Sequence, residues 1–498
     1  MEEASTPALL TASEVAGAIR IGQLSATEVV EAQLGRIEKF NPALNAIVTL
    51  DADNARCRAR EADRAIATGE ACGPLHGVPI TLKDSFDTAG LRTTSGYRPF
   101  RDRVPVEDAT PVARLREAGA IILGKTNLPA LANGLQTNNT LFGRTNNPWD
   151  LGRTPGGSSG GAAAAVSAGL SFLELGSDIG GSIRIPAHFC GVYGLKATAG
   201  RIAAKGHVAS ARRLPAPTGC EALFELASFG PIARSIEDLE LVLRIISEPG
   251  TPPLTPPAPR TLSELRVAWT DDFGGAPLDG GSRRLMHSFI EALTRGGCHV
   301  ERCSSVVDYV EAWRVSGICS AAVNTVFQSL PTRWFRRAVS PLLRQFGPRH
   351  PLMLGLFTGL ALDRACLRRA LEQRIRLIQQ LEEFLGAWDC WICPAFPTPA
   401  FTHRPARASI EVARQSLSQL EANLHSIIFN TTGHPVVTMP IGLSPEGLPI
   451  GVQVVGSRWQ EMALLNTVRQ IASVTRGFQR PPGYRRKMAS KVNLTLGS

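Results

Sequence analysis

Two glycine- and serine-rich segments lie close together in the first half of the chain. The first reads GGSSGG over residues 156–161, and the second reads GSDIGGSIR over residues 176–184. A nucleophilic serine needs a base within hydrogen-bonding distance and donors that stabilise the developing oxyanion. Successive backbone N–H groups in a glycine turn can point at one oxyanion, and a helix that begins there adds its dipole. The segment 176–184 therefore fits either an acyl-transfer site around Ser182 or a structural turn.

The first segment also satisfies the G-x-S-x-G pattern of a nucleophile elbow, centred on Ser159. An elbow serine lies at a sharp turn from a strand into a helix. The preceding residues, WDLGRTP at 149–155, contain proline, glycine and charge and do not predict a strand. A Ser-His-Asp triad would also need a histidine, and no distinguishing context marks any of the candidates His188, His207, His403, His425 and His434. The elbow interpretation is therefore disfavoured.

Lys83 is the other unusual residue. It ends the apolar run VPITLK at 78–83, just before a polar turn, in a chain with only seven lysines. Burial lowers the pKa of a lysine because it disfavours the ammonium form, and a neutral lysine can act as a base. The alternative is a strand-end lysine that pairs with Asp84 or Asp87. From the local sequence alone, we favour this pairing.

The composition is that of a globular protein, since 44% of the 498 residues are hydrophobic and 19% are charged. The net charge of +10 comes from arginine clusters that lack a nucleic-acid-binding motif, so we expect no nucleic-acid partner. The N-terminus does not resemble a secretory signal, and the apolar run 351–362 is shorter than the ~20 residues of a membrane-spanning helix. We expect a cytoplasmic protein without a transmembrane anchor.

The ten cysteines are scattered singly, apart from a C-x-x-C formed by Cys390 and Cys393. Such a pair can bind zinc or act in redox chemistry. Here it lies in an apolar run, with no second C-x-x-C and no histidine at zinc spacing. We therefore expect two buried core thiols and no metal site.

The elements that would position these residues alternate between helices and apolar strands. Thr11 with Glu14, and Ser25 with Glu28, each fit a capping box at the start of a helix. Helices are also expected through 109–120 and from 162 onward. Strands are expected at 78–82, 120–128, 171–175, 265–269, 390–396, 434–443 and 449–456. This alternation predicts an α/β fold with a largely parallel or mixed sheet.

A proline-rich linker at 250–260 precedes a mostly helical, arginine-rich stretch. Because strand-like runs return after residue 385, we prefer one large domain over two independent ones. The expected parts of this single domain, residues 1–498, are N-terminal helices (1–70), a catalytic core (71–250), a helical insertion (about 260–385) and a C-terminal part that rejoins the core (386–498).

Taken together, these segments resemble the amidase signature family. The resemblance is strongest in residues 152–202, which include both glycine-serine segments, and in the lysine strand GVPITLKD at 77–84. It also covers the approach LFGRTNNPWD at 141–150, whereas residues 260–425 are generic. The resemblance implies an amidase signature fold, with a large mixed central sheet covered by helices on both faces.

The resemblance also implies a Ser-cisSer-Lys triad. Ser182 would be the nucleophile, Ser158 the bridging serine and Lys83 the base. The oxyanion hole would consist of the backbone N–H groups of Ile179, Gly180 and Gly181, with that of Ser182, and supporting roles would fall to Ser159, Asp178 and Arg184. No metal or organic cofactor is implied.

The implied activity is hydrolysis of a carboxylic amide through a serine acyl-enzyme, giving a carboxylate and ammonia or an amine. The alternatives are the A subunit of a tRNA-dependent amidotransferase and a catalytically idle scaffold. Two departures argue against the A subunit: none of the four tyrosines is followed by aspartate, and Asn423 occupies the position of an acidic substrate-binding residue. We expect a small-molecule amide as the substrate, leave a homodimer open, and expect residues 333–357 to form a surface helix rather than a cap over the site.

Overall fold

The fold is built around one mixed sheet, seen in a computed structural model that describes Pro7 and residues 10–207, 226–304, 306–326, 330–347, 350–361, 363–405 and 408–484. Within these residues eleven strands pair in the order β1-β3-β2-β6-β8-β7-β14-β15-β11-β9-β10. They are β1 (Ile47–Leu50), β2 (Pro79–Lys83), β3 (Ile121–Thr126), β6 (Leu173–Asp178), β7 (Tyr193–Lys196), β8 (Ser228–Ala233), β9 (Arg266–Trp269), β10 (His299–Arg302), β11 (Cys390–Pro394), β14 (Val436–Leu443) and β15 (Pro449–Val455). Two short hairpins pair β4 (Asn138–Asn139) with β5 (Gly143–Arg144), and β12 (Ile410–Val412) with β13 (Gln415–Leu417).

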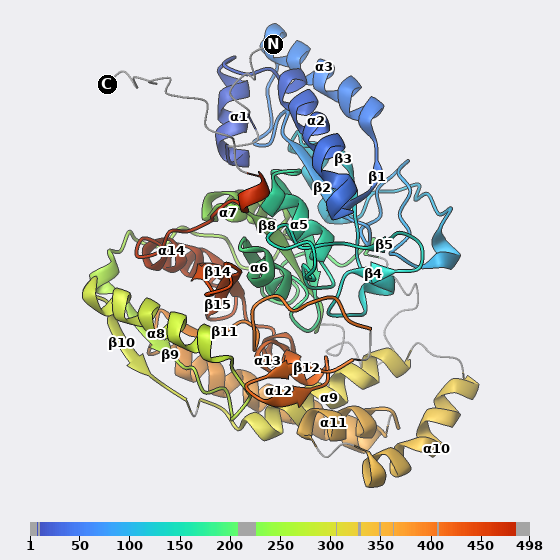
Figure 1. Ribbon diagram of the computed structural model, residues 1–498, viewed down its shortest axis with the longest axis vertical. Coiled ribbons are helices and arrows are strands. Elements are labelled where there is room, and N and C mark those ends of the chain that lie inside the picture. The colour runs from blue at the N-terminus through green and yellow to red at the C-terminus, as the bar shows by residue number, and fades with distance from the viewer. Residues whose placement is uncertain are drawn as a thin grey trace.

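The described residues also form fourteen helices (Figure 1). They are α1 (Ala12–Arg20), α2 (Ala26–Leu44), α3 (Ala52–Thr68), α4 (Thr110–Glu117), α5 (Gly160–Ala168), α6 (Arg184–Cys190), α7 (Ile236–Ile246), α8 (Gly280–Arg295), α9 (Tyr309–Val326), α10 (Leu330–Phe346), α11 (Pro351–Gly359), α12 (Arg364–Leu385), α13 (Leu424–Thr432) and α14 (Glu461–Ala472). Both expected capping boxes are confirmed, because Thr11 and Ser25 each exchange hydrogen bonds with the glutamate three residues on. These bonds satisfy N–H groups that the first helical turn leaves unpaired.

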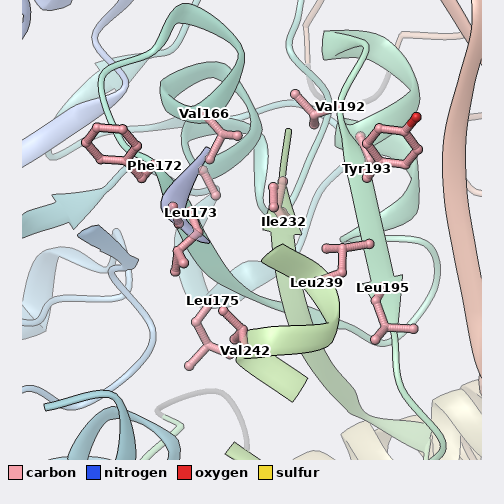
Figure 2. Packing of buried hydrophobic residues seen from close by; sticks show 14 of the residues in the cluster. Val166, Phe172, Leu173, Leu175, Val192, Tyr193, Leu195, Ile232, Leu239 and Val242 are labelled. Atoms are coloured by element: carbon pink, nitrogen blue, oxygen red, sulfur yellow. The ribbon is translucent and has the colours of Figure 1, made fainter. Parts of the chain in front are cut away.

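Helices cover both faces of the sheet, as the resemblance implies. Helices α5 and α6 pack against each other and against central strands, while α7 and α14 pack against each other and against β7, β8 and β14. Figure 2 shows Leu239 and Val242 of α7 beside Leu175 of β6 and Ile232 of β8, and all four side chains are fully buried. Burying each such side chain contributes about 1.5–3 kcal/mol. This packing fixes β6, which ends at Asp178.

Three adjacent strands at the middle of one half of the sheet, β3, β2 and β6, run parallel. The carboxyl ends of parallel strands meet at one edge of a sheet, where ligand sites of α/β folds are usually found. Lys83 ends β2 and Asp178 ends β6, and both residues are fully buried. The second glycine-serine segment leaves β6 at this edge, and Ser158 and Ser159 of the first segment contact Lys83 there.

The stretch expected as a helical insertion, at about 260–385, also supplies strands to the sheet. β9 and β10 pair in parallel at its edge, next to β11. Helices α9, α10 and α11 gather at the lower right of Figure 1, far from α1–α3. The division of the chain into the four parts named above stays a prediction.

Two simpler expectations can be compared directly with the structure. Cys390 and Cys393 lie in β11 as free, buried thiols, so their assignment to the core is confirmed. No helix in the described part of the chain is both long and apolar enough to span a bilayer.

Candidate active site

Lys83 is the centre of a cluster of serine hydroxyl groups. Its Nζ lies 2.7 Å from Ser158 Oγ, 2.9 Å from Ser159 Oγ and 2.9 Å from Ser177 Oγ. The carbonyl oxygen of Ser177 lies 3.5 Å away. The lysine side chain is fully buried, so this cluster provides its hydrogen-bonding partners in place of water.

The pairing of Lys83 with Asp84 or Asp87, which the local sequence favours, is wrong. Asp84 accepts hydrogen bonds from the backbone N–H and the hydroxyl of Thr94, and Asp87 forms an ion pair with Arg103 at 2.7 Å. Successive side chains of a strand point to opposite faces, so Lys83 and the residue that follows it do not share a face. The strand thereby turns Lys83 toward the serines of two other segments.

The first glycine-serine segment brings Ser158 and Ser159 to this lysine. The peptide bond between Gly157 and Ser158 is cis, the conformation that the resemblance implies for the bridging serine. Ser159 lies immediately before α5 and is not preceded by a strand. Its Oγ contacts Lys83, so its surroundings differ from those of an elbow serine, which follows a strand and pairs with a histidine.

A glycine in β6 makes room for this contact. A side chain at Gly176 would place its Cβ 2.8 Å from Ile183 and 3.3 Å from Ser159 Oγ. Substitution there would push the second segment and Ser159 apart. The glycine therefore permits close approach of the two segments.

The second segment carries Ser182, whose backbone bonds directly to the first segment. The backbone N–H of Ser159 donates to the carbonyl of Ser182 at 3.1 Å, which joins the two segments directly. In the described part of the chain, Ser182 Oγ makes no hydrogen bond with Ser158, so the structure places the two serines in adjacent segments without linking their hydroxyl groups. Burial decreases along this path: Lys83 and Ser158 are buried, whereas Ser182 is half-buried.

Asp178 and Arg184 hold the loop between them in a fixed shape. Their side chains are both fully buried and form an ion pair at 2.9 Å. Asp178 also accepts hydrogen bonds from the backbone N–H groups of Gly181 (2.8 Å) and Ile183 (3.0 Å). Burial alone would raise the pKa of Asp178, but the charge and hydrogen bonds of Arg184 together with the N–H of Ile183 hold that pKa well below its ordinary range.

Arg184 extends this arrangement to distant parts of the chain. Its guanidinium donates to the carbonyl of Ser426, 2.9 Å away, and to Gln453 Oε1, 2.6 Å away. It also donates to Asn430, whose amide in turn donates to Asp178. A fully buried arginine with acceptors on α13 and β15 thus anchors the loop that carries Ser182.

Two of the four residues expected to supply backbone donors to an oxyanion hole, Ile179 and Gly180, are on the exposed side of this loop. Ile179 is 40% exposed and Gly180 is half-buried. Gly181 differs, because its N–H already donates to Asp178. Its φ of +108° and the short distances from a Cβ to Ile185 and Ser426 also require glycine at this position.

Burial lowers the pKa of Lys83 to about 7, although the negative charges of Asp178 and Glu174 oppose this shift. About half of the lysines would therefore be neutral near pH 7. A neutral amine beside a hydroxyl group can accept its proton. The arrangement can thus perform general-base chemistry on Ser158.

Ser177 is a component of the cluster that the sequence did not reveal. It lies next to Asp178 at the end of β6, and both its hydroxyl and its carbonyl face Lys83. Its place within GSDIGGSIR, beside a residue expected to support the site, is the one signal that could have marked it.

With this geometry in hand, comparisons with known proteins establish the family. A profile of the Amidase family matches residues 28–465. Over 498 aligned residues the chain is 34% identical to the A subunit of the glutamyl-tRNA(Gln) amidotransferase of Moorella thermoacetica, covering 95% of this chain and 98% of that relative. This chain belongs to the amidase family.

Solved structures of related proteins agree with this assignment. The 6-aminohexanoate cyclic dimer hydrolase, in complex with its substrate, is 28% identical with a TM-score of 0.76, covering 96% of this chain and all of that one. A protein from a vestigial complex, which bears on the origins of an s-triazine catabolic enzyme, is 29% identical with a TM-score of 0.75, covering 93% and 98%. The amidase fold therefore extends over nearly the whole chain.

Proposed function

We propose that this chain hydrolyses the C–N bond of carboxylic amides through a serine acyl-enzyme. Ser182 would be the nucleophile, Ser158 the bridging serine and Lys83 the base. The observation that carries the proposal is the wholly buried Lys83, with its Nζ 2.7 Å from Ser158 Oγ and its pKa lowered to about 7. Such a group is a proton acceptor near neutral pH. When its hydrogen-bonded partner Ser158 gives up a proton to it, Ser158 can in turn accept the proton of a second serine.

In the acylation step, Ser182 Oγ attacks the carbonyl carbon and the carbonyl electron pair moves onto oxygen. Ser158 takes the proton of Ser182 while neutral Lys83 takes the proton of Ser158. As the tetrahedral intermediate collapses, the C–N bond breaks and Ser158 returns a proton to the leaving nitrogen. Water then attacks the acyl-enzyme through the same relay. The step requires the hydroxyl of Ser182 to turn toward Ser158. Catalytic hydrogen bonds of this kind often form only when substrate is bound.

The oxyanion would be stabilised by the backbone N–H groups of Ile179 and Gly180, together with that of Ser182. Gly181 would join them only if its bond to Asp178 opened. Asp178 and Arg184 would support the reaction indirectly, because their ion pair and hydrogen bonds hold the loop that aims these donors. Donors fixed before the reaction stabilise charge without reorganisation at the moment of attack.

Labelling with a fluorophosphonate, followed by peptide mapping, tests these roles. We expect an adduct on Ser182 in the wild-type protein and no adduct in Ser182→Ala or Lys83→Ala, whereas Ser159→Ala should still be labelled. An adduct on Ser159, or no adduct in the wild type, would contradict the assignment. A parallel screen for ammonia release over small alkyl and aryl amides would identify the substrate class.

A second candidate function is that of an amidotransferase A subunit. It is favoured by the 34% identity to the Moorella thermoacetica protein, which extends over nearly the full length of both chains. The same acyl-enzyme would then release ammonia to a partner. Asn423 weighs against it: the resemblance places an acidic substrate-binding residue here, and a neutral amide offers no carboxylate to an ammonium group. Glutaminase activity that appears only with copurifying partner chains would favour this function over the first.

A further inference from the structure

Helix α10 turns an apolar face away from the rest of the molecule. Trp334, Phe335 and Leu342 are 70%, 68% and 57% exposed. At 100° per residue, these three side chains and Ala338 fall on one side of the helix, and Ala338 is exposed as well. Contiguous large apolar side chains are uncommon on the surface of a protein and usually mark a contact site.

The opposite side of α10 is the one that packs on the protein. Ser340 is fully buried, and its hydroxyl donates to the carbonyl of Phe357 in α11 at 2.7 Å. Arg336 donates to Thr325 Oγ1 in α9 at 3.1 Å. These contacts fix the rotation of the helix about its axis. Among the residues that the structure describes, the apolar face is therefore the free face, and their packing does not account for it.

Among aspartate, glutamate, lysine and arginine, only positively charged side chains occur in the sequence around α10. From residue 312 to residue 362 the chain contains no aspartate or glutamate, but it contains the six arginines Arg314, Arg333, Arg336, Arg337, Arg344 and Arg349. Arg337 and Arg344 are exposed and lie along one border of the apolar face. A second copy of this chain would bring the same positive charge against this surface, so charge repulsion opposes self-association here.

We propose that the outward face of α10 binds the surface of an anionic lipid bilayer. Trp334, Phe335 and Leu342 would enter the boundary between headgroups and acyl chains, and Arg337 and Arg344 would contact lipid phosphates. Aromatic and leucine side chains on one face with arginine beside them are the features of helices that lie in the membrane interface. α10 is also an outlying element at the lower right of Figure 1, so a flat surface can reach it.

Vesicle cosedimentation tests this proposal independently of catalysis. The full chain is mixed with vesicles of phosphatidylcholine alone, or of phosphatidylcholine with 30% (about one-third) phosphatidylglycerol. We expect binding to the anionic vesicles and at least about tenfold weaker binding to the neutral ones, with the difference shrinking as salt is raised. Equal binding to both compositions, or binding to neither, would overturn it.

Two pairs of variants separate the apolar from the charged contribution. Trp334→Ala/Phe335→Ala/Leu342→Ala should weaken binding to the anionic vesicles at least about tenfold, whereas the matched control Ile21→Ala/Val106→Ala/Leu151→Ala, also exposed apolar residues, should not. Arg337→Gln/Arg344→Gln should weaken it by about 30-fold, at roughly fivefold per arginine. Arg58→Gln/Arg295→Gln, which removes the same charge from other exposed sites, should have little effect.

Two further measurements test whether the variants stay folded and whether this face instead mediates self-association. All variants should keep the thermal unfolding midpoint of the wild type, because the substituted side chains are exposed. Analytical ultracentrifugation without lipid should give the same mass for the wild type and the apolar triple variant. If the triple variant instead dissociates a wild-type dimer, or if single-stranded RNA binds this face while vesicles do not, the proposal is wrong.

Discussion

Two buried lysines lie on adjacent parallel strands, one register position apart. Lys83 ends β2 and Lys125 lies in β3, and the register pairs Leu82 with Lys125 and Lys83 with Thr126. Both side chains are fully buried. Burial lowers the pKa of both, to about 7 for Lys83 and to about 8 for Lys125.

Their partners are different in kind. Lys83 contacts three serine hydroxyls, and a hydroxyl group can both accept and release a proton. Lys125 donates to the carbonyl of Phe86 and to Thr88 Oγ1, and the charge of Asp84 opposes the fall in its pKa. A carbonyl can only accept, and the hydroxyl of Thr88 already donates its proton to the same carbonyl, 3.1 Å away. Burial alone therefore does not make a lysine a base: the proposed base, Lys83, is the lysine whose partners can give up a proton and belong to the segment bonded to that of the proposed nucleophile.

The largest effect expected from this comparison is on catalysis at Lys83. Lys83→Met should lower kcat/KM for amide hydrolysis by about 10³–10⁴-fold, because it removes the proton acceptor from the relay. The free energy of unfolding should change by no more than about 1 kcal/mol, since methionine fills a similar volume and removes a buried amine. Rates from initial ammonia release and urea unfolding would check both. A loss below tenfold would show that Ser158 has another base.

Lys125→Met should show the reverse pattern. It leaves the carbonyl of Phe86 without its donor and Asp84 without its nearby cation, so we expect the free energy of unfolding to fall by about 2–4 kcal/mol. The kcat/KM of the protein that remains folded should keep the pH dependence of the wild type. If Lys125→Met abolished fluorophosphonate labelling while remaining folded, the distinction between the two lysines would fail.

The wild-type pH profile should report the protonation of Lys83. Because burial brings its pKa down to about 7, acidification converts the base to an ammonium ion, and kcat/KM should fall about tenfold per pH unit below pH 7. A profile that stays flat from pH 8 to pH 5 would exclude Lys83 as the base.

The same shift has a consequence for stability. The pKa of the folded state lies below the ordinary value of 10.5, so between about pH 7 and pH 10.5 the unfolded state binds more protons than the folded state. Stability contributed by this group therefore increases with pH through that window. The increase should be absent in Lys83→Met, which separates Lys83 from other groups that titrate near neutral pH.

The sequence could predict which segments form this site, but it could not predict which side chains contact each other within it. The apolar run before Lys83 marks β2, and the resemblance to the amidase signature family selects Ser158 and Ser182. The predicted pairing of Lys83 with Asp84 or Asp87 is wrong, because these chain neighbours bond Thr94 and Arg103 instead. The contacts of Arg184 with Asn430 and Gln453 span 246 and 269 residues, so no local pattern reveals them. The edge strand β10 and its neighbour β9 are four residues long each, and their pairing depends on the rest of the sheet.

Ser177, which the sequence did not reveal, offers a smaller effect. A neutral lysine has one lone pair and two N–H bonds, so when Ser159 and Ser177 accept those two bonds the lone pair faces Ser158. Ser177→Ala should lower kcat/KM by about tenfold. It should also move the acid limb to lower pH, because an acceptor that stabilises the ammonium form is lost. Ser167→Ala, which removes a buried hydroxyl bonded to the carbonyl of Cys190, should change neither.

Glu174 should have the smallest effect, because it acts on Lys83 through charge alone. Its carboxylate accepts a hydrogen bond from Thr81 Oγ1 at 2.8 Å, and its charge opposes the fall in the pKa of Lys83. Burial raises the pKa of Glu174 itself to about 7, so its titration overlaps that of the lysine. Glu174→Gln keeps the shape and removes the charge, so the acid limb should move to lower pH by less than about one unit.

The control for this substitution is Glu461→Gln, which neutralises another buried carboxylate, the partner of Arg201 at 2.8 Å. It should reduce stability without moving the acid limb, because Glu461 does not affect the pKa of Lys83. A limb that moves to higher pH in Glu174→Gln, or by the same amount in both variants, would show that the profile does not report Lys83. The charge of Glu174 acts on both Lys83 and Lys125. A shift confined to Glu174→Gln would therefore show that one of these two lysines titrates in the profile, and Lys83 is the one that contacts Ser158.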